Sequence, residues 1–168
     1  MTKQLDKGVA GVAHALNSWR CDRLTQYMST LGFEDLDFED LVERLSDGTL
    51  VDTVVAQSVV LHFSTWLFLP RIDPIYVAML PWSTQYIIRS ILNICEEYSY
   101  HQQGMGILPW TTAIRVALFT SVGNDGTMQS WGRELCVRLE RRYSVRLLSD
   151  IIASLPGAGP DEKLKFDD

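Results

Sequence analysis

Apolar residues recur at helical spacing along most of the chain, and strand-like alternation is scarce. Residues 8–31 carry an apolar series in steps of three and four with one slip, which predicts an amphipathic helix that stops at Gly32. Asp35 or Asp37 can cap a second, shorter helix, and "SDGT" at 46–49 predicts a turn. The apolar positions of the two helices are Val9, Val12, Ala13, Leu16, Trp19, Leu24, Tyr27, Met28 and Leu31, then Phe38, Leu41, Val42 and Leu45.

Residues 53–70 form the longest uncharged run, "TVVAQSVVLHFSTWLFLP", if His62 is counted as neutral. Its length nearly spans a bilayer. Several polar side chains interrupt it, and no basic residue flanks its N-terminal side, so we favour a buried core helix over a membrane span. We expect Pro70 to close this helix and "RIDP" to form a loop.

The second half of the chain predicts four more helices. A short one around 75–80 is interrupted by Pro81, and the next, over 83–100, can be capped by Ser83 or Thr84. Another starts at Thr111 or Thr112 and runs to 122, and the last runs from about residue 130 to residue 155. The sequence thus predicts an all-α domain of six to eight helices over 1–156, followed by a polar tail, 157–168, that we expect to be disordered.

Composition fits one globular domain. The chain has 168 residues, 46% of them hydrophobic and 21% charged, which is enough for a real core. Its formal net charge of −6 argues against a nucleic-acid partner. Seven acids lie in 34–47 and five arginines in 133–146. These two helices could face each other, but we favour two solvated faces, because exposed ion pairs stabilise little.

Candidate catalytic chemistry is sparse. Cys21, Cys95 and Cys136 are widely spaced, which suggests small buried or half-buried thiols and not a zinc site. No histidine has neighbours that suggest metal ligation, and His62, on an apolar helix, is expected to be a core residue. We therefore expect no enzyme, no metal and no cofactor. Five tryptophans are many for this length, and they suit either core packing or the rim of an aromatic groove.

One short stretch points to a family. "DGTMQSWGREL" at 125–135 resembles the Trp-Gly-Arg motif of the Bcl-2 family of apoptosis regulators, although its spacer is one residue longer and Ser130 replaces an Asn. The resemblance implies a helical bundle with a central apolar hairpin and a surface groove for a partner's helix. In the family this motif opens the hairpin, which needs on the order of 45 to 50 residues. Only 37 residues follow Trp131.

A second register covers more of the chain. Here Trp82 stands for the first motif, the hairpin is formed by 83–100 and 111–122, and Trp131 stands for the family's second Trp motif. Upstream, "FEDLVERLSDGT" at 38–49 is similar to the family's death-motif helix, and 8–31 would be the first helix. Short viral members of the family have similarly degenerate motifs, so the resemblance extends to a viral protein.

The resemblance implies an apoptosis inhibitor that sequesters pro-apoptotic proteins by holding their death-motif helix in the groove. In the family an Arg of the groove pairs with an Asp of that helix. The corresponding residue here is Arg89 in the second register, where Thr84 occupies the motif position, and Arg133 in the literal one. The implied groove wall comprises Met79, Trp82, Tyr86, Phe63 and Trp66.

The same resemblance implies a cytoplasmic protein, at the mitochondrial outer membrane if an anchor segment follows Asp168, and it is compatible with a homodimer. Two alternatives stay open. One is a helical structural or assembly protein without an apoptotic partner, and the other is a Bcl-2-like fold directed at another target.

Overall fold

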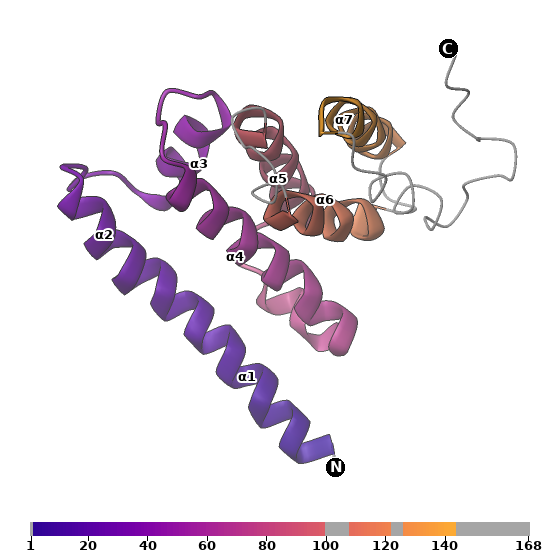
Figure 1. Ribbon diagram of the computed structural model, residues 1–168. Helices are drawn as coiled ribbons and strands as arrows, with labels where there is room; N and C mark the ends of the chain where they lie inside the picture. Colours follow the sequence, from indigo (N-terminus) through magenta and orange to yellow (C-terminus); the bar gives the residue numbers. More distant parts are fainter. Residues whose placement is uncertain (1, 100–107, 122–125, 144–168) are drawn as a thin grey trace, which may run out of the picture.

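The computed structural model describes residues 2–99, 108–121 and 126–143, and their regular elements are all helical (Figure 1). This confirms the predicted all-α class. The second half of the predicted last helix and the predicted polar tail lie outside the described residues. In chain order the elements are α1 (Thr2–Ser18), the π-helical segment η1 (Trp19–Leu24), α2 (Thr25–Thr30), α3 (Phe38–Ser46), α4 (Thr53–Ile72), the 3-10 helix η2 (Pro74–Met79), α5 (Thr84–Ser99), α6 (Leu108–Ser121) and α7 (Gly126–Tyr143).

The slip in the first apolar series has a structural cause. The step from Trp19 to Leu24 is five residues long, and these two residues bound the π-helical segment η1. A π turn accommodates one extra residue, so the apolar face stays on the same side of α1 and α2. The three segments form one long helix along the side of the molecule (Figure 1).

Side-chain caps fix the starts of three helices. Asp37 Oδ1 accepts from the backbone N–H of Asp40 at 2.8 Å, and Ser83 Oγ accepts from that of Tyr86 at 3.2 Å, as the sequence predicts. Asp52, which the sequence analysis did not single out, caps α4 by accepting from the N–H of Val55 at 2.9 Å. These caps therefore set the first residues of α3, α4 and α5.

Three predicted boundaries are wrong. Helix α4 continues through Pro70 to Ile72, because a proline in the last turn removes only one hydrogen bond of the helix. Helix α6 begins at Leu108, three residues before the predicted start. Pro109 is tolerated in its first turn, because N–H groups at that position have no hydrogen-bond partner within the helix and proline loses nothing by lacking one. Helix α7 begins at Gly126, because the buried Met128 starts its apolar face earlier than expected.

Helix α5 is the central helix of the core. This helix contacts α3, α4, α6 and α7, and α4, α5 and α6 all pack on one another. Helices α5 and α6, which correspond to the segments 83–100 and 111–122 of the second register, therefore pack on each other. Trp66 and Trp110 are buried core residues, as one of the two interpretations of the tryptophans predicted. Fully or nearly buried on α5 are Ile87, Ile88, Ile91, Leu92, Ile94, Cys95 and Tyr98.

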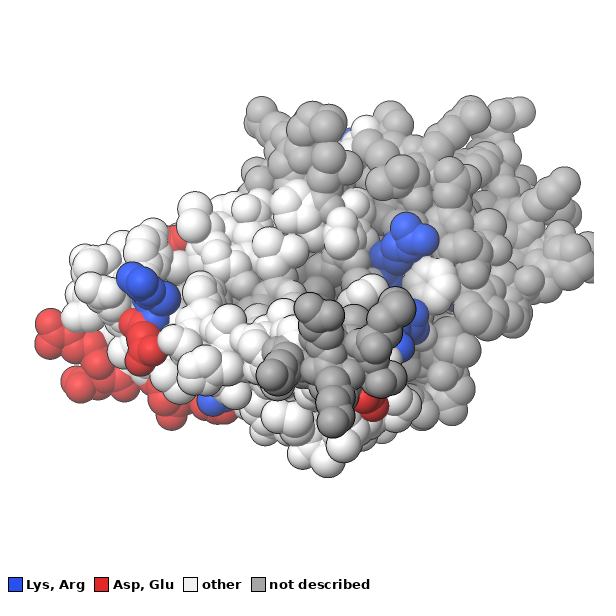
Figure 2. Space-filling view, turned by 90° about the horizontal axis from the view of Figure 1, so that it is seen from below, with Lys and Arg blue, Asp and Glu red and all other residues white. Residues whose placement is uncertain are grey.

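Charged residues lie mainly outside this core. All seven acids in 34–47 are exposed, and acidic side chains gather at the end of the molecule where α2 leads to α3 (Figure 2). On α7, Arg138 pairs with Glu96 of α5 at 2.5 Å. The acidic face is thus solvated. Cys95 and Cys136 are buried as expected, and burial raises the pKa of Cys136 to about 12. Cys21 is exposed, so the expectation of a buried or half-buried thiol is wrong there.

Candidate partner-binding groove between α4 and α6

The aromatic residues assigned to the groove wall do come together. The Phe63 ring lies edge-on to Trp82 at 5.3 Å and to Tyr86 at 6.2 Å, and Trp82 and Tyr86 are parallel neighbours at 6.4 Å. Phe63 and Trp66 are buried, and Trp82 and Tyr86 are half-buried. Helix α4 and the start of α5 therefore build one aromatic cluster.

That cluster is covered by the chain itself. Phe38 of α3 stacks on Trp82 with ring centres 5.0 Å apart, and the Arg20 guanidinium of η1 lies 4.9 Å from the Trp82 ring. The indole Nε1 of Trp82 donates to Glu39 Oε1 at 2.7 Å. A partner helix would have to displace α3 and η1 to reach these rings. In this structure the cluster acts as core packing.

His62 lies inside the same cluster, as expected of a core residue. Its Nε2 accepts from Trp66 Nε1 at 3.2 Å, and the Trp19 ring lies 4.8 Å away. Burial, with a smaller contribution from the positive charge of Arg20, lowers the pKa of His62 to about 4. The imidazole is therefore neutral at physiological pH.

The other assigned residues belong to three different elements, η2, α5 and α7. Met79, at the end of η2, is half exposed. Arg89 is exposed on α5 and forms no hydrogen bond or ion pair with the described residues, while Arg133 is half-buried on α7. None of these three residues lines the groove described below.

The Trp-Gly-Arg stretch joins α7 to the core. Gly132 is buried so closely against α6 that a Cβ atom there would lie 2.3 Å from Leu118 Cδ2. Beside it, Trp131 Nε1 donates to Glu96 Oε2 of α5 at 2.8 Å. The glycine therefore permits close helix packing, and the tryptophan fixes the position of α7 over α5.

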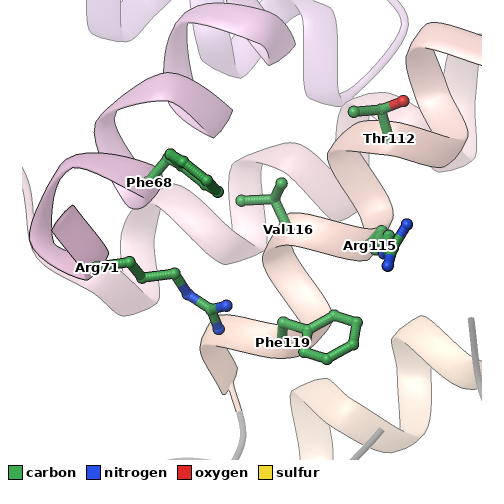
Figure 3. Close-up of a pocket in the computed structure, with 6 residues that line it drawn as sticks. All are labelled: Phe68, Arg71, Thr112, Arg115, Val116 and Phe119. Atoms are coloured by element: carbon green, nitrogen blue, oxygen red, sulfur yellow. The ribbon is translucent and has the colours of Figure 1, made fainter. Parts of the chain in front are cut away.

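An open groove lies between the C-terminal half of α4 and α6. Its cavity volume is about 320 Å³, and Phe68 on its α4 side is 52% exposed. Phe68 and Val116 point toward each other across the groove, and Phe119 lies at its end near Arg71 (Figure 3). The lining residues are Phe68, Arg71, Thr112, Arg115, Val116 and Phe119. An apolar side chain therefore has both space and apolar walls here.

Two arginine side chains, Arg71 and Arg115, lie at the edge of this groove. The guanidinium carbon of Arg71 lies 5.7 Å from the Phe119 ring centre, and that of Arg115 lies 5.6 Å from it. Such cation–π contacts are worth about 0.5–1 kcal/mol at exposed sites, so they bias the two arginines toward this rim. Both arginines are exposed, and neither pairs with a carboxylate of the described residues. The site can therefore hold an apolar group with a carboxylate beside it.

Sequence reasoning missed this groove, although part of its signal was present. Thr112, Arg115, Val116 and Phe119 follow helical steps of three and one, so they share one face of α6. Nothing in the sequence says that the end of α4 lies beside that face. The groove depends on a contact between distant segments.

Comparison with known proteins adds no relative. No protein-family model matches the chain, and no curated protein or solved structure gives a significant match. Among the described residues no group of three or more His, Cys, Asp or Glu side chains could hold a metal ion. One described helix, α4, is long and apolar enough to cross a membrane, and 56% of that stretch is buried within the protein.

Proposed function

We propose that this protein binds an amphipathic helix of another protein in the groove between α4 and α6. The observation that carries the proposal is the combination of an exposed Phe68, an apolar wall and two arginines at one rim. Helix-in-groove recognition uses apolar side chains on successive turns for affinity and a charged pair for orientation. The occupant that fits is an apolar helix face with an acidic residue at its edge.

The proposed partner is the death-motif helix of a pro-apoptotic protein, and the proposed role is inhibition of apoptosis by sequestration. Two features support a Bcl-2-like arrangement. Helix α5 is buried among α3, α4, α6 and α7 and packs on α6, in keeping with an apolar hairpin wrapped by other helices. The Trp-Gly pair at 131–132 lies where α7 meets this hairpin.

In this proposal the partner's apolar residues fill the space between Phe68 and Val116. The partner's Asp then lies at the rim, where Arg71 and Arg115 donate charge-assisted hydrogen bonds. These two arginines take the role that the family resemblance gave to Arg89 or Arg133. The aromatic cluster around Trp82 serves as the support that holds α4 in place.

A peptide-binding experiment tests the proposal. Fluorescence anisotropy with a panel of labelled death-motif peptides should show binding of at least one of them at micromolar concentration. Arg115→Ala and Arg71→Ala should each weaken it by about tenfold or more, about 1.4 kcal/mol, with an unchanged helical spectrum. Arg89→Ala is the matched control, since Arg89 is also exposed but lies outside the groove.

The other outcomes are informative. If Arg89→Ala or Arg133→Ala weakens binding and the groove variants do not, the family-based assignment is right and the groove assignment is wrong. If no death-motif peptide binds, the apoptotic role fails.

The assembly-protein alternative also has one observation in its favour. The seven acids in 34–47 and the two arginines of the groove are exposed and opposite in charge, so two copies can pair through them. Sedimentation velocity over a range of protein and salt concentrations tests this. Salt-sensitive assembly without any peptide affinity would support the assembly role.

A further inference from the structure

Helix α4 carries an uncovered apolar face along nearly its whole length. Residues 54, 58, 61, 65, 68 and 72 follow steps of four and three, so they lie on one side of the helix. The large apolar members of this stripe are Val54, Leu61, Phe68 and Ile72, which are 62%, 45%, 52% and 44% exposed. At 1.5 Å per residue the stripe is about 27 Å long.

The stripe meets a cavity at each of its ends. At its C-terminal end Phe68 belongs to the groove against α6. At its N-terminal end Val54 and Ser58 line a second cavity of about 230 Å³ together with Trp19, Arg23 and Tyr27 of η1 and α2. Helix α4 lies between the α1–α2 helix and α6 (Figure 1), and its exposed stripe runs from one cavity to the other. We call the stripe with its two cavities the α4 channel.

Exposed arginines lie at both ends of this channel, whereas the carboxylates that flank α4 in the sequence, Asp52 and Asp73, accept backbone N–H groups as helix caps. Helix α4 contains no Asp or Glu. Arg23 stands at the first cavity, and Arg71 and Arg115 stand at the other. All three arginines are exposed, and none of them forms an ion pair with the described residues. A ligand with carboxylates near both ends of an apolar face would complement the channel.

We infer that the binding site spans the whole of α4 and takes one long acidic amphipathic helix of about five turns. The inference rests on the proposed function and extends it, because it assigns the α1–α2 wall and Arg23 to the site. The ligand presents apolar residues on successive turns, one row wide, with acidic residues toward both ends. The stripe is one residue wide and has a cavity at each end, which suits the apolar face of a bound helix.

Two synthetic peptides test the length of the site. One is an acidic amphipathic helix of about 20 residues, which spans the stripe. The other is the half of this peptide that occupies the α4–α6 groove. Neither peptide derives from an apoptotic protein, so both probe the chemistry alone. We expect the long peptide to bind about tenfold or more tighter than its half by fluorescence anisotropy.

Variants on the protein locate the contact. Arg23→Glu and Leu61→Glu should each weaken the long peptide by about tenfold or more, and Arg23→Glu should leave the half-length peptide unchanged. Val51→Glu is the matched control, because Val51 is 79% exposed and precedes the stripe. Circular dichroism of each variant verifies the fold, and Arg23, as an exposed residue, provides a test that does not depend on packing.

The results separate this inference from the proposed function. If the long and half-length peptides bind equally and Arg23→Glu has no effect, the extended site is refuted while the groove stands. If the synthetic long helix binds but no death-motif peptide does, the apoptotic role fails and the extended site stands. If neither binds, or if the stripe is instead buried by self-association or on anionic vesicles, the inference is overturned.

Discussion

Replacing Gly132 by Ala tests how α7 is joined to the core. A Cβ atom at this position would lie 2.3 Å from Leu118 Cδ2, 3.2 Å from Leu118 Cγ and 3.5 Å from Leu92 Cδ2. Leu118 is 1% exposed and Leu92 is fully buried, so neither side chain has solvent space to move into. The added methyl group must therefore push α7 away from α6 or force Leu118 out of its rotamer.

The magnitude follows from two opposing effects. Overpacking of a buried site costs about 1–3 kcal/mol, and replacing a helical glycine by alanine returns up to about 1 kcal/mol. We expect Gly132→Ala to lower the free energy of unfolding by about 1–2 kcal/mol. Gly11→Ala in α1 is the matched control, because an added Cβ there meets no atom within 4 Å, and it should be neutral or stabilising.

Urea denaturation followed by far-ultraviolet circular dichroism measures both variants. If α7 packs this closely on α6, the two variants should shift the unfolding midpoint in opposite directions or by clearly different amounts, at similar slopes. A Gly132→Ala variant as stable as the wild type would refute the close approach of α7 to α6.

Two further predictions concern the core. Val59 is fully buried, so Val59→Asp should unfold the protein, because an unpaired buried carboxylate costs several kcal/mol. Val54→Asp, on the exposed face of the same helix, should stay folded and soluble. Circular dichroism and sedimentation compare the two variants. The pKa of His62 is lowered from 6.5 to about 4 in the folded protein, so the unfolded state binds more protons between these pH values. The free energy of unfolding should therefore fall by up to about 3 kcal/mol as the pH is lowered from 6.5 to 4. Urea titrations at several pH values check this, and a His62→Phe variant with the same pH dependence would contradict it.

Local signals in the sequence predicted much of the fold. Helical spacing located the elements, and the caps at Asp37 and Ser83 depend on side chains only three residues from the N–H groups they bind. The slip at Trp19 was visible, but its cause was not, since a π turn is recognised by its backbone hydrogen bonds. Pro70 misled, because the effect of a proline depends on its position within the helix.

The site was less predictable for a different reason. Phe63, Trp82 and Tyr86 were expected together and do meet, yet the sequence could not show that Phe38 and Arg20 cover them. Exposed and buried aromatic clusters have the same sequence pattern. The α4–α6 groove depends on the contact of two segments more than 40 residues apart, and only the tertiary structure places Phe68 beside Arg115.

A charge-swap cycle between Arg115 and the acidic residue of the bound helix tests directly whether the α4–α6 groove binds that helix. Affinities are measured by fluorescence anisotropy for the wild-type protein and Arg115→Glu, each with an acidic amphipathic peptide and with the same peptide carrying Lys in place of its Asp. We expect each single reversal to weaken binding by about tenfold or more and the double reversal to recover most of the loss. Additive losses without recovery, or no binding of the original peptide, would contradict the account.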